Sequence, residues 1–164
     1  MELSELNSLL NIIATRVEFA KYDFPIIVSV NSDKTSSIVL SIGNKEIDFN
    51  YNVIKMSPNN YEKYNCIEIK AENLSIKNLI QIGDIENHTG DAGEWGHGIC
   101  LRHCKNIIVD NCTFSYNWGD GIDLIDTYYG DACPENIKIL NTKCLYNRRQ
   151  GISVEAVKTA NFKI

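Results

Sequence analysis

The chain has 164 residues, of which 44% are hydrophobic and 23% charged, and this composition predicts one globular domain with a continuous core rather than a disordered chain or a coiled coil. The net charge of -5, with no run of Lys and Arg that could neutralise a row of phosphates, argues against a nucleic-acid partner. No stretch approaches the ~20 apolar residues that span a bilayer, and Glu2 and Glu5 stand where a signal peptide carries positive charge, so we expect neither a membrane partner nor a signal peptide in this chain.

Residues 1–35 are predicted to form an N-terminal cap helix and the strands that lead into the main domain. Apolar side chains recur there at helical spacing, followed by strand-like runs at 26–30 and 37–41. The helical positions are Leu3, Leu6, Leu10, Ile13 and Val17. We expect this amphipathic helix to cover the first coil of the domain. The alternative is that residues 1–30 belong to a helix that faces a partner.

An internal repeat runs through the remainder of the chain. Asn followed three residues later by a branched aliphatic residue recurs at Asn44/Ile47, Asn73/Ile76, Asn106/Val109, Asn136/Ile139 and Asn161/Ile164. Gly-Ile recurs between these phrases at Gly98, Gly121 and Gly151, and the intervening segments alternate apolar and polar residues as strands do. Self-similarity at this period predicts a solenoid with two short strands per repeat. Asn suits its corners because it tolerates left-handed backbone and can bond the next coil.

These phrases resemble the pectate-lyase-like right-handed parallel β-helix superfamily over roughly residues 36–164. The segment from Gly90 to Ile99 (GDAGEWGHGI) is similar to an insertion in bacterial and phage-related members. The resemblance implies an all-β fold, a right-handed parallel β-helix solenoid with a short N-terminal capping helix. Members chiefly bind, cleave or epimerise polysaccharides. It therefore implies a polysaccharide or glycan partner, and an extracellular, cell-surface or virion location for the full-length protein.

The C-terminal end shows no predicted cap. The chain stops at Ile164, inside a strand that starts at Asn161, and solenoids need capped ends. We expect the coils of residues 36–164 to be truncated there, as the N-terminal part of a longer protein; an incomplete gene product without activity is the alternative. The six cysteines form no C-x-x-C pair and are expected to be reduced packing thiols, against a disulfide between stacked coils such as Cys104 with Cys133.

Aligning the Gly-Ile phrases places side chains of successive coils above one another. The predicted rows are Glu94, Asn117 and Asn147; Trp95, Trp118 and Arg148; His97, Asp120 and Gln150; and Cys100, Asp123 and Ser153. With Ile122 and Leu124 pointing inward, Asp123 points outward. By the same parity, the residues expected to face solvent are Cys100, Arg102, Ser153 and Glu155.

Asp120 and Asp123 are the candidate pair of carboxylates for glycoside hydrolysis, with Asp91, Glu94 or Glu155 as further candidates. The phrase from Asn117 to Asp123 (NWGDGID) looks like the N-T-D-G-I-D corner of polygalacturonases, in which the first Asp is a catalytic acid or base, so the resemblance assigns a role to Asp120 alone. The next coil departs from that family, because residues 149–151 read RQG where polygalacturonases carry G-H-G. The alternative is that Asp120 bonds corner amides and Asp123 is a solvated charge.

Lyase chemistry needs a base and a cation that neutralises a uronate carboxylate. The candidate base is His97 or His103, and the candidate neutralisers are Arg102, Arg148 and Arg149. The alternative is that a His beside Gly only forms a hydrogen bond at a corner. Calcium is the candidate cofactor, and its candidate ligands are Asp120, Asp123 and Asp126.

Aromatic side chains are the candidate contacts to sugar rings, whose apolar faces suit stacking. The candidates are Trp95, Trp118 and Arg148 as one stack, Glu94 beside them, and Tyr128 and Tyr129 in a long turn. Long turns on a regular solenoid commonly wall a groove. The alternative is that the stacked residues only pack against their own corner and the two tyrosines only pack against their own loop.

Together these features predict a polysaccharide-directed protein, a lyase, hydrolase or epimerase acting on an acidic or complex glycan. The alternative from a different class is a non-catalytic glycan-binding adhesin or tail-fibre-type module. Such a module would pack as a homotrimeric rod and keep its aromatic contacts without using the carboxylates.

Overall fold

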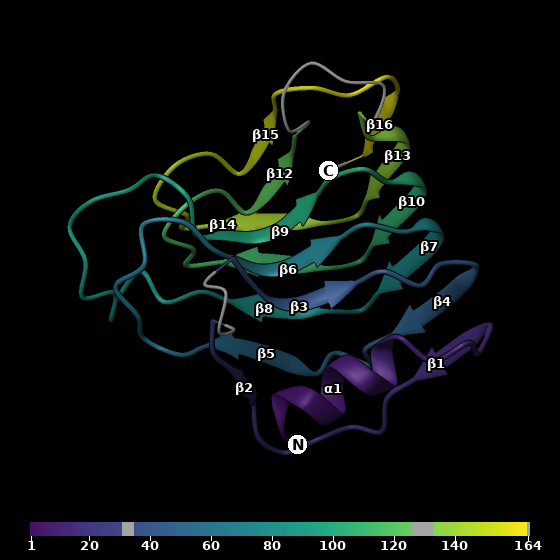
Figure 1. Ribbon diagram of the computed structural model, residues 1–164, viewed down its shortest axis with the longest axis horizontal. Helices are drawn as coiled ribbons and strands as arrows, with labels where there is room; N and C mark the ends of the chain where they lie inside the picture. The colour runs from purple at the N-terminus through teal and green to yellow at the C-terminus, as the bar shows by residue number, and fades with distance from the viewer. Residues whose placement is uncertain (31–34, 126–132, 164) are drawn as a thin grey trace.

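The chain folds into a parallel β-helix (Figure 1). The computed structural model describes residues 1–30, 35–125 and 133–163. Each full coil contributes one strand to each of three parallel sheets, so neighbours in a sheet come from successive coils. The predicted solenoid is confirmed with one correction: a repeat carries three strands, because a short strand of the second sheet follows the strand with the Asn phrase.

The first sheet contains β1 (Arg16–Glu18), β4 (Lys45–Asp48), β7 (Glu72–Lys77), β10 (Lys105–Asp110), β13 (Glu135–Leu140) and β16 (Ala160–Lys163). The second sheet contains β2 (Ile26–Val28), β5 (Val53–Met56), β8 (Ile80–Ile82), β11 (Thr113–Ser115) and β14 (Lys143–Leu145). The third sheet contains β3 (Ser36–Leu40), β6 (Asn65–Ile69), β9 (His97–Leu101), β12 (Ile122–Leu124) and β15 (Ile152–Val154).

The register places like apolar side chains in rows along the core. One row of the third sheet consists of Ile38, Ile67, Ile99, Ile122 and Ile152. The first four are at most 1% exposed, and burying each side chain contributes roughly 1.5–3 kcal/mol. A slip by one residue would turn the polar outer side chains into this core, so the rows fix the register.

Four of the five predicted Asn corners stack; the fifth is wrong, because Asn161 lies inside β16 and pairs with Lys138 rather than with Asn136. Asn44, Asn73, Asn106 and Asn136 have φ between 53° and 56°, in the left-handed region that Asn adopts more readily than most residues. The side-chain amides of Asn73, Asn106 and Asn136 each donate a hydrogen bond to the side-chain oxygen of the Asn on the preceding coil, at 2.9, 2.7 and 2.8 Å. The recurring Asn therefore both turns the chain and joins successive coils.

The helix α1 (Leu3–Leu10) covers the first coil, with Leu6 and Leu10 fully buried. It is shorter than the predicted apolar face. Ile13 is 92% exposed and Val17 lies in β1, because the chain leaves the helix to enter the first sheet. Within the described ranges, no helix has the length and apolar character to cross a bilayer.

Two Asn side chains of the helix bond to the edge of β3. The Val39 N–H donates to Asn7 Oδ1 at 3.1 Å, and the Asn11 amide donates to the Val39 carbonyl at 2.8 Å. The Ser41 N–H donates to Asn11 Oδ1 at 2.9 Å. The helix therefore satisfies the backbone groups that a preceding strand would otherwise pair, which protects an open sheet edge.

The six cysteines are free thiols, so the expectation of reduced cysteines is confirmed and the Cys104–Cys133 disulfide is wrong. At the opposite end from α1, large apolar side chains of the last coil are exposed. They are Leu145 at 42%, Tyr146 at 71%, Val154 at 48% and Phe162 at 42%. The expected truncation after this coil stays a prediction.

Candidate active site

The candidate site lies on the outer side of the third sheet, where β9 and β12 are neighbours. Cys100 of β9 pairs with Asp123 of β12, which pairs with Ser153 of β15, so this predicted row is confirmed. The inward packing of Ile122 and Leu124, both fully buried, fixes Asp123 on the other side of its strand.

This outer face is covered, contrary to the expectation that it faces solvent. Cys100 is 0% and Asp123 2% exposed, whereas Arg102 is half-buried and Glu155 is exposed. The row is crowded because Glu68 precedes Cys100 in register. The Arg102 guanidinium lies 3.9 Å from both the Cys100 sulfur and a Glu68 oxygen. The two acids of the site are therefore buried rather than open to solvent.

The row of His97, Asp120 and Gln150 is also confirmed, by hydrogen bonds between successive coils. The Asp120 N–H donates to His97 Nδ1 at 3.0 Å, and the Gln150 N–H donates to Asp120 Oδ1 at 2.7 Å. The alternative reading, that Asp120 bonds corner amides, thus holds for one of its oxygens.

We call Asp120 and Asp123 the carboxylate pair. Within the described part of the chain, each has one oxygen in a hydrogen bond and one buried oxygen without a hydrogen-bond partner, Asp120 Oδ2 and Asp123 Oδ1. Asp123 Oδ2 accepts from the Cys100 thiol at 3.7 Å. One ligand-type atom from each carboxylate and from His97 lies within 4.8 Å of the others. Buried polar atoms are rarely left unpaired, so these two oxygens point to a function.

Burial sets the charge states of this cluster. It raises the pKa of Asp123 to about 7, with help from the Glu155 charge, and it also raises the pKa of Asp120. Burial lowers the pKa of His97 to about 4, with help from the nearby Arg149 charge. Near neutral pH, Asp123 therefore exists in both protonation states while His97 is neutral. These states suit Asp123 better than His97 for transferring a proton near neutral pH.

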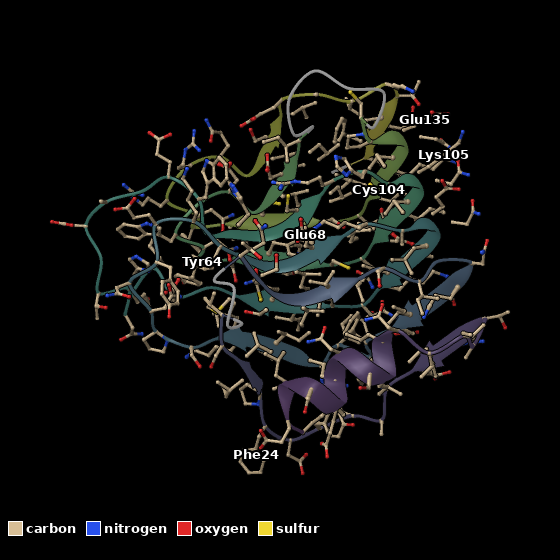
Figure 2. All side chains as sticks on the ribbon, viewed as in Figure 1. Phe24, Tyr64, Glu68, Cys104, Lys105 and Glu135 are labelled. Carbon is tan, nitrogen blue, oxygen red and sulfur yellow. The ribbon has the colours of Figure 1, made fainter. Side chains whose placement is uncertain are left out.

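Sequence reasoning missed Glu68, which is 3% exposed in the same row as Asp123. Figure 2 labels it on the third sheet. It accepts a hydrogen bond from Ser36 Oγ at 2.8 Å and pairs with Lys70 at 3.1 Å and Arg102 at 3.9 Å. The signal for it was the phrase Cys66-Ile67, which stands in register with the Gly-Ile phrase at Gly98. Arg102 is therefore already balanced by a carboxylate.

The predicted stack of Trp95, Trp118 and Arg148 is wrong at Trp95. His88 stacks on Trp118 with ring centroids 4.1 Å apart, and the Arg148 guanidinium lies 3.9 Å from the Trp118 centroid. Trp95 instead has Lys63 Nζ 4.8 Å from its ring. Because His88 and Arg148 come from the coils before and after Trp118, the two faces of that indole are occupied.

The insertion before β9 explains why Glu94 and Trp95 do not lie in their predicted rows. Gly93 (φ 85°) and Gly96 (φ 139°) adopt backbone conformations that favour glycine, and between them Glu94 turns outward, with its side chain 73% exposed. Gln81 of β8 takes the predicted place of Glu94 and exchanges hydrogen bonds of 2.9 and 3.0 Å with Asn117. Alignment of the Gly-Ile phrases could not show this turn.

A second buried cluster anchors the insertion and has no counterpart in the repeat phrases. Tyr64, labelled in Figure 2, donates its hydroxyl to Asp84, which also contacts His88 Nδ1 at 2.9 Å and accepts from the Asn59 amide at 2.9 Å. Burial and the Asp84 charge raise the pKa of Tyr64, which keeps it a hydroxyl donor. This cluster fixes the base of the His88 and Trp118 stack.

Three predicted residues, Asp126, Tyr128 and Tyr129, lie outside the described residues, so their roles stay predictions. Calcium takes about six to eight oxygen ligands. The described part of the predicted calcium cluster offers the carboxylate pair alone, with an imidazole beside it. These described residues by themselves do not fit calcium.

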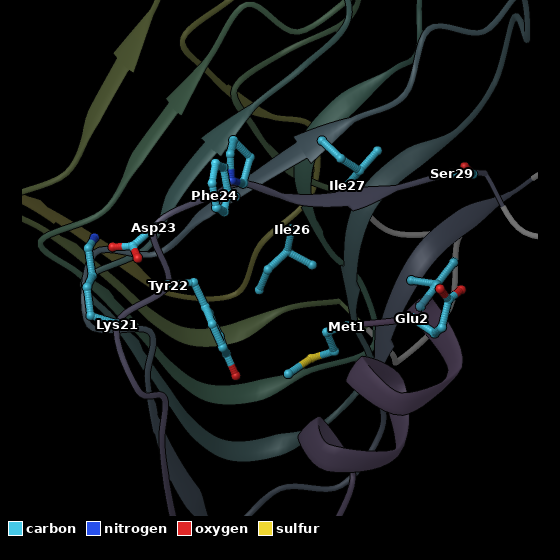
Figure 3. A pocket seen from close by; sticks show the side chains of 11 residues that line it. Met1, Glu2, Lys21, Tyr22, Asp23, Phe24, Ile26, Ile27 and Ser29 are labelled. Carbon is cyan, nitrogen blue, oxygen red and sulfur yellow. The ribbon is translucent and has the colours of Figure 1, made fainter.

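A separate cavity of about 660 Å³ lies between the start of α1 and the segment 21–29 (Figure 3). Its lining includes Phe24, which is 81% exposed. None of the candidate site residues lines it, so it is unrelated to the carboxylate pair.

Comparisons with known proteins agree with this architecture. The chain is 32% identical over 113 residues to the uncharacterized protein YclG of Bacillus subtilis (strain 168), a match that covers 62% of this chain and 19% of that protein. It is 35% identical over 78 residues to the SPbeta prophage-derived uncharacterized protein YorA of the same strain, covering 43% of this chain and 13% of that protein. The chain thus spans less than a fifth of the length of either relative. No solved structure matches it. A family model described as "Right handed beta helix region" matches residues 26–164, and the chain belongs to this family.

Proposed function

We propose that this chain is a polysaccharide-directed β-helix protein whose carboxylate pair catalyses glycoside hydrolysis. The observation that carries the proposal is the pair of buried oxygens on Asp120 and Asp123 that accept no hydrogen bond from the described residues. Glycosidases use one carboxylic acid to protonate the leaving oxygen and a second, ionised carboxylate as base or nucleophile. Asp123, whose pKa is about 7, supplies the acid. Asp120 supplies the carboxylate, with the Arg149 guanidinium 3.9 Å away to favour its charge.

We propose an acidic or complex glycan as the substrate and an extracellular, cell-surface or virion location for the full-length protein. Family membership and the prophage origin in the printed name of one relative support this proposal. The rim beside the carboxylate pair carries Arg148, which is exposed, and Arg149, which is half-buried. Two guanidinium groups at the entrance suit carboxylate or sulfate groups on the sugar chain.

The test is incubation of the purified chain with a panel of neutral and uronate polysaccharides, with and without calcium. We expect reducing ends without unsaturated ends, and a loss of roughly 100-fold or more in rate for Asp120→Asn and for Asp123→Asn. Asp91→Asn, which removes an exposed carboxylate of the neighbouring insertion, is the matched control and should retain full activity. Unsaturated ends would replace the hydrolase with a lyase, and unchanged activity in both site variants would refute the assignment of the pair.

The burial of the carboxylate pair favours a second candidate, a non-catalytic glycan-binding or tail-fibre-type module. Asp120 is 0% and Asp123 2% exposed, so a sugar would have to displace neighbouring side chains to reach them. A binding module would bind glycans equally well after both acids are changed to Asn and would release no reducing ends. A homotrimeric rod belongs with this second candidate.

A further inference from the structure

We propose that His97 is a positioning residue, held by the Asp120 backbone amide as the neutral Nε2–H tautomer so that its N–H and the Cys100 thiol face the same oxygen of Asp123. For its catalytic meaning this inference rests on the proposed hydrolase. The tautomer itself is a property of the folded chain and can be measured without any substrate.

His97 Nδ1 lies beside two groups of Asp120, the backbone N–H and, at 3.4 Å, the side-chain oxygen Oδ2, and the tautomer follows from its hydrogen bond with the first. The Asp120 N–H donates to His97 Nδ1 at 3.0 Å, and a ring nitrogen that accepts a hydrogen bond holds a lone pair and no proton. The ring is 4% exposed and lies near two guanidinium groups, which disfavour a second proton on it. The single ring proton therefore sits on Nε2.

Nε2 lies 3.7 Å from Asp123 Oδ2, the same oxygen that accepts from the Cys100 thiol. Burial raises the pKa of Cys100, so the sulfur stays protonated and remains a donor. Contacts of this length in a free enzyme commonly tighten when a substrate binds. Because both donor groups face Oδ2, the proton that Asp123 transfers is carried by Oδ1, the oxygen that has no hydrogen-bond partner among the described residues.

The same tautomer argues against a metal ion at His97, Asp120 and Asp123, although their ligand-type atoms lie within 4.8 Å of one another. A metal-bound imidazole offers one nitrogen lone pair to the ion and donates its other N–H to a neighbour. Here the nitrogen with the lone pair already accepts an amide, and the nitrogen that faces Asp123 carries the proton.

The first experiment is a long-range proton–nitrogen NMR correlation on the folded chain labelled with ¹⁵N-histidine. The chain has three histidines, and the signal missing in His97→Gln identifies the ring. We expect a protonated Nε2 and an unprotonated Nδ1 from neutral pH down to about pH 5, unchanged when zinc or calcium is added. A proton on Nδ1, an imidazolium at neutral pH, or a shift of the His97 signals on adding zinc would overturn the proposal.

The second readout is the pKa of Asp123, followed by carboxyl ¹³C NMR. His97→Ala removes the N–H and should raise this pKa, whereas His97→Gln keeps an amide donor at the same place and should restore most of the original value. Cys100→Ala should raise the pKa, and Cys100→Ser, which keeps a donor, should change it less. His103→Gln, an exposed histidine, is the control. Equal pKa values in the Ala and Gln variants would reduce His97 to a packing role.

The two proposals can fail separately. If no polysaccharide is cleaved while the NMR results hold, the hydrolase falls and the tautomer stands. If cleavage depends on the carboxylate pair while His97 carries its proton on Nδ1, only the positioning role falls.

Discussion

At the residue scale, two neighbouring side chains respond to pH in opposite directions. Asp123 moves from its ordinary pKa of 3.8 to about 7, so the stability that it contributes is full below about pH 4 and is lost as the pH rises to about 7. His97 moves from 6.5 to about 4, so its contribution is full above about pH 6.5 and is lost as the pH falls to about 4. Over the shared window the two effects offset each other.

Variants that remove one of the two residues should therefore show opposite dependences of the free energy of unfolding on pH. Between about pH 4 and pH 6.5, the free energy of unfolding should rise with pH in Asp123→Asn, where His97 is left, and fall with pH in His97→Gln, where Asp123 is left. Each slope should amount to on the order of 3 kcal/mol across the window, and the parent should be flatter than either. Urea denaturation at several pH values measures this, with Asp91→Asn as the control. Parallel curves for the two variants would contradict the charge states assigned to the site.

At the element scale, α1 stabilises the first coil by polar bonds as well as by apolar burial. Asn7 and Asn11 receive or donate hydrogen bonds along β3, at Val39 and Ser41 among others. Replacing either Asn by Ala leaves backbone groups of a half-buried edge unpaired, which should cost about 1–3 kcal/mol. Urea denaturation gives this value, and Ser8→Ala on the exposed side of the helix is the matched control.

Hydrogen exchange locates the effect of these variants. The amides of Val39 and Ser41 should exchange faster in the Asn7→Ala and Asn11→Ala variants, because each loses its acceptor. Amides of β12, which lies three coils away, should keep their protection relative to global stability. If β3 keeps its protection while the whole chain is destabilised, the helix acts through its apolar face alone.

The same scale shows what the sequence could predict. The Asn phrases mark one strand of each coil because their corners are left-handed. The Gly-Ile phrases mark another because a side chain at Gly98 or Gly121 would collide with neighbouring coils, and both strands were found. The strand between them, such as β11, has three residues and too little alternation to be seen. The candidate rows at Asp120 and Asp123 were right because no glycine turn separates their phrases. The rows at Glu94 and Trp95 were wrong because Gly93 and Gly96 redirect the backbone there.

At the scale of the whole molecule, the strand register predicted from the sequence identifies which side chains share a row, but it does not predict how deeply those side chains are buried. The alternation of side chains along β12 predicts that Asp123 lies on the outer side of the strand, and this prediction is confirmed. Its contacts with His97 and Cys100 come from the preceding coil, and the burial that raises its pKa arises only when the coils are assembled. Periodicity reports direction relative to the core, whereas exposure is a property of the assembled surface.

The two ends of the solenoid differ, and this difference predicts self-association. At one end α1 covers β3 and leaves β1 and β2 as edge strands, whereas at the other β14, β15 and β16 are all uncovered edge strands among the described residues. Exposed apolar side chains such as Leu145 and Phe162 lie on those open edges. Open parallel edges with apolar side chains pair with other copies. Light scattering on this chain should therefore show a mass that rises with protein concentration.

Charges on the open edge should suppress that association. The double variant Leu145→Lys with Phe162→Lys should shift the mass toward the monomer, because lysine on an edge strand disfavours pairing with a second copy. The matched control is Phe24→Lys, which places the same charge on an exposed aromatic at the end that holds α1 (Figure 3). It should leave the association unchanged. If Phe24→Lys alone disperses the protein, the contact lies at the cavity beside α1; a fixed trimer at every concentration would instead support the homotrimeric rod.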